Sequence, residues 1–194
     1  MFPTEIFRET LSRLVDILAE LKVKFHLTGG ITSVAYGEPR MTQDIDIVVD
    51  NMAIARALDA FTSAASQAGF MLDAKAVRQA VAEKSMFQLF DMTEALKIDI
   101  YPREMIPGEL GRSTFLEVFE GMPIPVVSRP DAAASKLAWA SKGSHKSRRD
   151  LRQIVRHMPH AERVELDRLA GLLGLGNRSE EHTSELQSRQ YLVC

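Results

Sequence analysis

The chain is poor in cysteine, with Cys194 as the single thiol in 194 residues. One cysteine cannot form an intramolecular disulfide, which excludes a small disulfide-stabilised secreted fold and favours a cytoplasmic location. The sequence also lacks any apolar run near the roughly 18 residues that a membrane-spanning helix requires, so no membrane segment is expected. Its first residues, MFPTEIFRET, have neither the basic start nor the apolar segment of a signal peptide.

An excess of charge of one sign is missing as well. The 24 Lys and Arg residues stand against 26 Asp and Glu residues, a formal net charge of −2. This near balance excludes a protein that is basic overall, although local basic patches remain compatible with it. With 45% hydrophobic and 26% charged residues, the composition is that of an ordinary globular protein. The length suits one medium domain, or one domain with a helical appendage.

The last residues, 178–194, read RSEEHTSELQSRQYLVC and resemble the translation of a common sequencing-library adapter. We interpret them as an assembly artefact and leave them out of the fold prediction. A polar natural tail is the alternative. If the adapter interpretation holds, the natural protein has no cysteine and its own C-terminal sequence is missing beyond about Asn177.

One segment, KFHLTGGITSVAYGEPRMTQDIDIVVD at residues 24–50, organises the rest of the chain. Its pattern predicts a strand at Lys24–Thr28, a turn at Gly29 and Gly30, a short helix at Ile31–Tyr36, and a second strand from Asp44. Two glycines let the backbone approach a ligand closely, and the N-terminus of a following helix favours phosphate. The segment therefore predicts a phosphate-binding turn next to a strand.

Two carboxylates open the second strand. Side chains alternate between the faces of a strand, so Asp44 and Asp46 point to one face while Ile45, Ile47 and Val49 point to the other. Two such carboxylates lie about 7 Å apart and repel each other unless a cation lies between them. The pair therefore predicts a metal site.

A third acid occurs in the predicted strand Leu96–Tyr101. Its apolar positions are Leu96, Ile98 and Ile100, and its alternate positions are Lys97, Asp99 and Tyr101. Burying an unpaired carboxylate costs several kcal/mol, so Asp99 needs a partner. A metal ion shared with Asp44 and Asp46 is one such partner, and a salt bridge to Lys97 or Arg103 is the alternative.

Polar side chains near the glycine turn are further candidates. The hydroxyls of Thr28 and Ser33 flank the turn and could contact phosphate, or could bond the local backbone instead. Arg40, in the following loop, could hold phosphate or orient Asp44, or could simply be solvated. We interpret His26 as a histidine on the surface of the first strand rather than as a ligand.

Periodicity in the rest of the chain predicts a mixed α/β (α+β) fold, a small sheet flanked by helices with a helical segment at the C-terminal end. Asp50 is expected to cap a helix that continues to Gly69. The other expected helices lie at 4–21, 74–84, 130–142, 146–158 and 164–173, and the other expected strands at 86–90, 115–119 and 125–128.

Positive charge gathers in the C-terminal helices. Lys136 lies on the first of them, and Arg148, Arg152 and Arg156 recur every four residues on the next, which places them on one face together with the neighbouring Arg149. Such a stripe could hold a triphosphate or an RNA, and a solvated helix face is the alternative.

The Gly29-Gly30 turn, the short helix and the Asp44-x-Asp46 entry into a strand resemble the signature of the nucleotidyltransferase superfamily. The run Arg40–Asp46 is most similar to the small bacterial group that includes the AbiEii-type toxins. Lys136 and the pair Arg149-Asp150 also fit that group, which often has a further acid where this chain has Gln153.

This resemblance implies a nucleotidyltransferase catalytic core at 1–128, followed by the helical segment at 129–177. It implies an enzyme that moves a nucleoside monophosphate from a nucleoside triphosphate to an acceptor hydroxyl with two Mg²⁺ ions, with tRNA as an expected acceptor and a cognate antitoxin as an expected partner. The implied catalytic and metal-binding residues are Asp44, Asp46 and Asp99. The implied nucleotide-binding residues are Thr28, Gly29, Gly30, Ser33, Arg40, Lys136 and Arg149.

Two other functions fit parts of the pattern. A catalytically silent module of the same fold that binds a nucleotide or a partner would also retain the fold, although the presence of all three acids argues against it. A glycosyltransferase could also use an Asp-x-Asp metal site, but it usually needs a larger nucleotide-sugar domain.

Overall fold

A computed structural model describes residues 4–37 and 44–176 of the chain, so the predictions for Arg40 and for the tail 178–194 lie outside the described residues. The described chain forms two compact units. One comprises residues 4–31 and 44–127, and the other comprises residues 32–37 and 128–176. None of the described helices is both long enough and apolar enough to cross a membrane.

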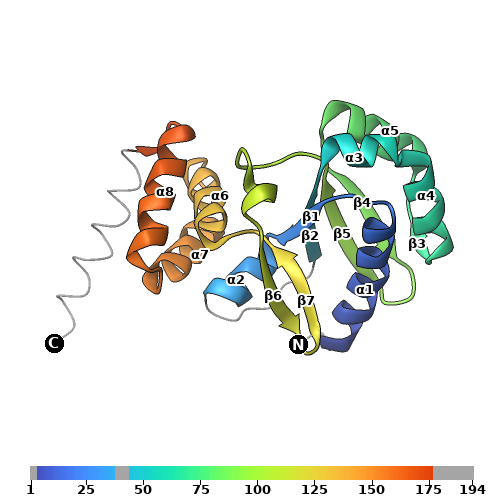
Figure 1. Ribbon diagram of the computed structural model, residues 1–194, viewed down its shortest axis with the longest axis horizontal. Coiled ribbons are helices and arrows are strands. Elements are labelled where there is room, and N and C mark those ends of the chain that lie inside the picture. Colours follow the sequence, from blue (N-terminus) through green and yellow to red (C-terminus); the bar gives the residue numbers. More distant parts are fainter. Residues whose placement is uncertain (1–3, 38–43, 177–194) are drawn as a thin grey trace. The chain divides into compact units, whose positions relative to one another are not determined.

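The described part of the first unit is built on a seven-stranded sheet with the order β3-β4-β5-β2-β1-β7-β6 (Figure 1). The sheet is mixed, because β2 pairs antiparallel with β1 and parallel with β5. This confirms the predicted small mixed sheet. The strands are β1 Phe25–Thr28, β2 Asp44–Val49, β3 Phe70–Met71, β4 Phe87–Asp91, β5 Leu96–Tyr101, β6 Thr114–Phe119 and β7 Met122–Val126.

The register at the centre of the sheet decides where the acids lie. Asp46 on β2 is opposite Thr28 on β1 and opposite Asp99 on β5. The alternate positions of these strands form the apolar face, and their side chains are fully buried: Ile45, Ile47, Leu89, Ile98 and Ile100. The alternation of apolar and polar side chains in the sequence therefore places the acids together on the opposite face.

The helices of the first unit are α1 Thr4–Glu20, α3 Asn51–Arg56, α4 Leu58–Gln67, α5 Ala74–Glu83 and the 3₁₀ helix η1 Glu109–Arg112. Phe61 of α4 meets Phe87 of β4 edge-on, with ring centroids 6.1 Å apart. Arg13 of α1 forms an ion pair with Asp91 at the end of β4. These contacts hold α1 and α4 to β4, where burial of apolar side chains supplies the main stabilisation.

A helix and a strand differ in their boundaries from the sequence-based expectation. The helix predicted to continue to Gly69 is interrupted at Ala57, where the chain leaves α3 and starts α4. Asp50 caps α3 as predicted, accepting a hydrogen bond of 2.7 Å from the backbone N–H of Ala53. The strand β7 starts at Met122, earlier than expected. The sequence-based prediction missed this start because Pro123 and Pro125 lack the N–H that a strand interior needs, which made the segment look irregular.

The described second unit consists of the helices α6 Arg129–Ser141, α7 His145–Arg156 and α8 His160–Leu172, together with the last turns of α2 Gly30–Tyr36. Ser128 and Ser144 cap α6 and α7 by accepting hydrogen bonds from the backbone N–H groups of Asp131 and Ser147. The buried apolar side chains of these helices form the interior of the unit: Ala133, Leu137, Leu151, Ile154 and Leu169.

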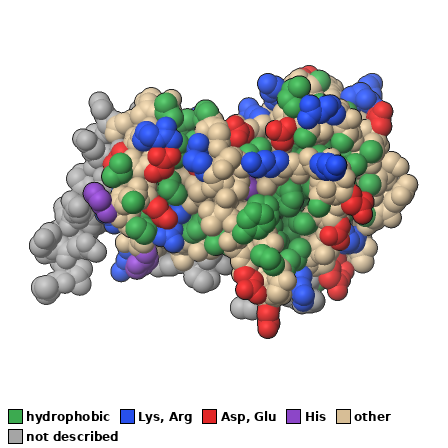
Figure 2. Space-filling view, in the orientation of Figure 1, with side chains coloured by type: hydrophobic (Ala, Val, Ile, Leu, Met, Phe, Trp, Pro, Cys, Tyr) green, Lys and Arg blue, Asp and Glu red, His purple; other side chains and the backbone are tan. Residues whose placement is uncertain are grey.

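Hydrophobic side chains also reach the surface of the first unit. In the space-filling view they gather over β6 and β7, while charged side chains of both signs are scattered around them (Figure 2). Phe115 on β6, the strand at one edge of the described sheet, is 70% exposed.

Candidate active site

The carboxylate of Asp46 is held beneath the double-glycine turn. Gly29 has φ +66°, a backbone conformation that side chains rarely adopt, and a Cβ placed there would lie only 1.9 Å from Oδ2 of Asp46. The backbone N–H of Gly30 donates a hydrogen bond to the Asp46 carboxylate. From the sequence we expected this turn to admit phosphate, and the structure shows that it also positions an acid.

Asp44, Asp46 and Asp99 share one face of the sheet. Burial raises the pKa of Asp46, and the neighbouring carboxylates of Asp44 and Asp99 raise it further. The hydrogen bonds from Gly30 and from the Tyr101 hydroxyl, which lies 3.3 Å from Oδ1, oppose this effect because they favour the charged form. The site therefore concentrates negative charge that a cation would stabilise.

Lys97 lies between two of these acids. Its Nζ is 3.0 Å from Oδ2 of Asp99 and 3.7 Å from Oδ2 of Asp44. The hydrogen bond to Asp99 raises the pKa of Lys97, because it stabilises the protonated amine. Of the two arrangements considered for Asp99, the salt bridge to Lys97 is present. Within residues 4–37 and 44–176, the structure shows no group of three or more side chains arranged to hold a metal ion.

Gln88 fixes the other oxygen of Asp99. Its Nε2 donates a hydrogen bond of 2.9 Å to Oδ1 of Asp99 from the opposite position on β4. The Asp99 side chain is only 8% exposed, so both of its oxygens are engaged in a nearly buried site. No feature of the sequence points to Gln88, because a single glutamine in a strand is not distinctive.

The two hydroxyl candidates differ in their surroundings. Thr28 is half-buried at the end of β1. Ser33 lies on α2, three residues after Gly30, and is 3% exposed. Among the described residues, the Ser33 hydroxyl has no hydrogen-bond partner, so the local backbone bond considered from the sequence is not formed. A buried hydroxyl without a partner is costly, and it is available to a ligand.

The basic candidates belong to the second unit. Lys136 forms an ion pair with Asp150, with Nζ 3.1 Å from Oδ2, and the two side chains are 12% and 4% exposed. Arg149 is exposed on α7 next to Asp150. The structure thus brings Lys136 and Asp150 together, while contacts of Lys136 and Arg149 with a nucleotide stay a prediction.

The prediction for His26 was wrong. The side chain is fully buried, with Nδ1 2.8 Å from the Ser113 hydroxyl and Nε2 3.9 Å from Oε2 of the buried Glu109. Glu109 and Ser113 belong to η1 and its C-terminal end, which pack against this face of β1. The alternation of side chains along β1 could not reveal the burial of His26, because the residues that bury it come from a segment about 85 residues away in the sequence.

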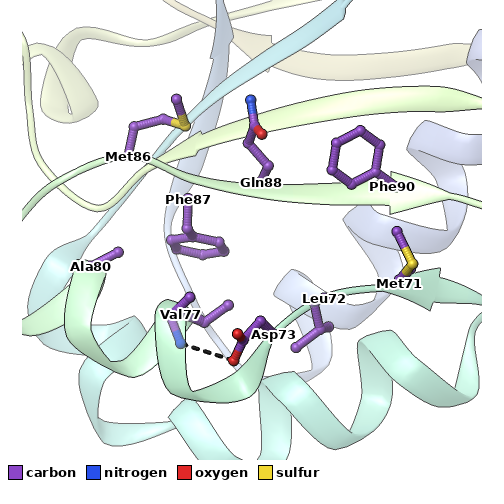
Figure 3. A pocket seen from close by; sticks show the side chains of 10 residues that line it. Met71, Leu72, Asp73, Val77, Ala80, Met86, Phe87, Gln88 and Phe90 are labelled. Atoms are coloured by element: carbon purple, nitrogen blue, oxygen red, sulfur yellow. Dashed lines mark hydrogen bonds between the residues drawn. The ribbon is translucent and has the colours of Figure 1, made fainter.

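A separate hollow of about 590 Å³ lies at the edge of the sheet between α5 and β4. Figure 3 shows that Met86, Gln88 and Phe90 extend to one side of β4, while Phe87 extends to the other side toward Val77 of α5. The lining is mostly apolar, and its carboxylate, Asp73, accepts hydrogen bonds that cap α5. Gln88 is the side chain that joins this hollow to the acids through Asp99.

The sheet, the glycine turn and the paired acids define a nucleotidyltransferase fold. The solution structure of the antibiotic-resistance factor ANT(2'')-Ia is similar, with a TM-score of 0.51 and 12% identity over 100% of this chain and 96% of that one. The crystal structure of ANT(2'')-Ia in complex with adenylyl-2''-tobramycin gives 0.50 and 12% over 97% and 99%. Lincomycin-bound LnuA, a lincosamide antibiotic adenylyltransferase, gives 0.45 and 16% over 84% and 94%. No curated protein matches the sequence.

The particular family follows from the sequence as a whole. The family model described as nucleotidyl transferase AbiEii toxin of type IV toxin–antitoxin systems matches residues 12–174, and the chain belongs to this family. The resemblance inferred from residues 24–50 is thereby confirmed.

Proposed function

We propose that the protein transfers a nucleoside monophosphate from a nucleoside triphosphate to an acceptor hydroxyl with the help of Mg²⁺. The observation that carries this proposal is the position in which the Asp46 carboxylate is held. Its carboxylate is fixed by Gly29 and Gly30 and lies beside Asp44 and Asp99 on one face of the sheet. Such an arrangement costs stability in the absence of a cation, so it is best explained by a function that uses one.

The three carboxylates fit a divalent metal of the Mg²⁺ type. Mg²⁺ prefers hard oxygen ligands and usually binds through one or two carboxylates together with substrate phosphates. Asp44, Asp46 and Asp99 supply such oxygens. Burial and then the carboxylates of Asp44 and Asp99 raise the pKa of Asp46, and a cation would offset both effects. When bound, two Mg²⁺ ions would neutralise the charge that develops on the attacking and leaving oxygens.

The chain's own groups account for binding of the nucleotide. The Ser33 hydroxyl is buried without a partner in the described part of the chain and would donate a hydrogen bond to a phosphate oxygen. The turn at Gly29 and Gly30, with Thr28 before it, is proposed to admit the β- and γ-phosphates, because glycine lets the backbone approach a ligand closely. Arg40, Lys136 and Arg149 are proposed as further phosphate contacts, since cationic side chains suit the charge of a triphosphate.

We assign the activation of the acceptor to Asp99. Asp99 would help to hold a metal ion next to the acceptor hydroxyl, which favours loss of the hydroxyl proton as the oxygen attacks the α-phosphorus. A bond forms between the acceptor oxygen and the α-phosphorus, the bond between the α- and β-phosphates breaks, and pyrophosphate leaves. Gln88 would keep Asp99 oriented during this step through its hydrogen bond to Oδ1.

An RNA acceptor of the tRNA type is supported by the charge of the second unit. Residues 128–176 contain ten Lys and Arg residues but only five Asp and Glu residues, although the whole chain is slightly acidic. On α7 the acid Asp150 is nearly buried against Lys136, whereas Arg149 and Arg156 are exposed. Clustered cations of this kind bind the phosphates of nucleic acids. The toxin family further supports a cognate antitoxin as a partner and the cytoplasm as the place of action.

The test is incubation of the protein with each α-labelled nucleoside triphosphate, Mg²⁺, and either total cellular RNA or total protein. We expect label in the RNA fraction with the wild type and none with Asp46→Asn. Asp50→Asn is the matched control, because Asp50 lies on the same strand face but caps α3, a task that asparagine also performs. Full transfer by a folded Asp46→Asn variant would refute the proposal and favour the catalytically silent binding module.

A further inference from the structure

In the described part of the chain, the structure places the cation of Lys97 among the three acids. Its register partner on β2 is Asp44, and Asp99 is two residues away on the same face of β5. The ammonium is within hydrogen-bond distance of Asp99 and within ion-pair distance of Asp44. One flexible side chain thus neutralises part of the charge of two proposed metal ligands that lie on different strands.

The ammonium group and a divalent metal would compete for the same oxygens. A lysine ammonium has three donors and no acceptor, so it satisfies carboxylate oxygens but cannot itself bind a metal. A metal that takes up Oδ2 of Asp99 and Oδ2 of Asp44 must therefore displace Nζ of Lys97. Both occupants carry positive charge, so their simultaneous presence at these oxygens is unfavourable.

The surroundings allow this displacement. The side chains of Lys97 and Asp44 are each 35% exposed, and a lysine stem can carry its ammonium out into solvent. Asp99 stays oriented when Lys97 leaves, because Gln88 holds Oδ1 independently. Asp46 likewise keeps its hydrogen bonds from Gly30 and Tyr101. The departure of one side chain therefore opens the acids without rearranging them.

We propose that Lys97 is an exchangeable counter-ion, which occupies the acids of the metal-free protein and leaves when a divalent cation binds. This inference rests on the proposed function, since it concerns the same metal site. It assigns Lys97 a specificity role: the side chain lowers the affinity for free metal and so favours metal that arrives together with a polyphosphate. The site then binds little metal in the absence of nucleotide, and in the metal-free protein Lys97 reduces the repulsion between Asp44 and Asp99.

The experiment measures Mn²⁺ binding in the absence of nucleotide by the electron paramagnetic resonance signal of the free ion, with Mn²⁺ as a probe for an oxygen-ligand site. Lys97→Met removes the charge but keeps the length of the stem, and we expect it to bind Mn²⁺ about tenfold more tightly than the wild type, which corresponds to about 1.4 kcal/mol. Its melting temperature in EDTA should fall, and added Mn²⁺ should restore it.

Three variants complete the design. Lys97→Arg keeps the charge and should retain wild-type affinity for Mn²⁺. Lys75→Met removes an exposed lysine from α5 and should also bind as the wild type does. Lys97→Gln keeps a hydrogen-bond donor for Asp99 without the charge, and it should bind more tightly, as Lys97→Met does.

The outcomes separate this inference from the proposed function. Wild-type binding with unchanged or weaker binding by both neutral variants would refute the counter-ion role alone and leave Lys97 as a residue that positions the acids. No Mn²⁺ binding by the wild type or any variant, with and without nucleoside triphosphate, would refute the proposed function and the counter-ion role together.

Discussion

The substitution Gly29→Ala tests most directly whether the glycine turn holds the Asp46 carboxylate in place. The added Cβ would lie 1.9 Å from Oδ2, 2.4 Å from Cγ and 2.7 Å from Cβ of Asp46, whereas ordinary contacts begin at 3.4 Å. The carboxylate must therefore move by about 1.5 Å or the turn must open. Either change breaks the hydrogen bonds that Gly30 and Tyr101 donate to Asp46.

Two contributions set the expected loss of stability. Placing a side chain at φ +66° costs about 1 to 2 kcal/mol on its own. Losing a hydrogen bond to a charged group costs about 1.5 to 3 kcal/mol more. We therefore expect the free energy of unfolding to fall by about 2.5 to 5 kcal/mol, which lowers the melting temperature by roughly 10 °C in a protein of this size.

Gly121→Ala is the control for backbone strain. Gly121 has φ +72°, close to that of Gly29, but a Cβ there would meet nothing within 4 Å. It should lose only about 1 to 2 kcal/mol. Urea unfolding of both variants in EDTA measures the difference, and Mn²⁺ binding should weaken in Gly29→Ala alone. Equal losses in the two variants would show that Gly29 serves only its turn and that Asp46 is not held by it.

The remaining predictions concern charge, capping and the tail. Burial and like charges raise the pKa of Asp46, so the folded protein holds the Asp46 proton more tightly than the unfolded chain does and loses stability as pH rises above the ordinary value of 3.8. Asp46→Asn should therefore have a higher melting temperature than the wild type at pH 7 in EDTA but not near pH 3.5. A difference in melting temperature that is the same at both pH values would contradict this. Lys136→Met removes the ion pair between Lys136 and the nearly buried Asp150, and it should lower the free energy of unfolding by up to about 3 to 5 kcal/mol. Most of this loss should be recovered in Lys136→Met/Asp150→Leu in urea unfolding, and an additive double variant would argue against the pair. Asp50→Asn should change the melting temperature by no more than a degree or two, because asparagine also caps helices, and deletion of residues 178–194 should leave it unchanged in calorimetry.

The sequence was informative where structure depends on local periodicity. Alternation along 44–49 and 96–101 predicted the shared face of Asp44, Asp46 and Asp99, because the period of a strand does not depend on the rest of the fold. Capping by Asp50 was also predictable, since the cap involves only residues three positions apart.

What the sequence could not reveal depends on contacts between distant segments. The role of Gly29 as the seat of Asp46 requires that β1 and β2 pair in one particular register. The burial of His26 depends on η1, whose sequence has no regular period. The ion pair of Lys136 with Asp150 was not predictable either, because it arises only when α6 packs against α7. The selection of Lys97 over Arg103 as the partner of Asp99 is likewise a matter of side-chain conformation.

The parallel pairing of β2 with β5 has a consequence for how the protein is made. Asp46 and Asp99 are adjacent in the sheet but 53 positions apart in the chain, so their pairing requires closure of a long loop that holds α3, α4, β3, α5 and β4. Such non-local pairings form late in folding, because the entropy of closing the loop is lost before the contacts are gained. A ribosome-bound chain therefore cannot assemble the acids until residues beyond Tyr101 have emerged. A chain of this topology therefore lacks the assembled acids while it is being synthesised, and so does any fragment that ends before β5.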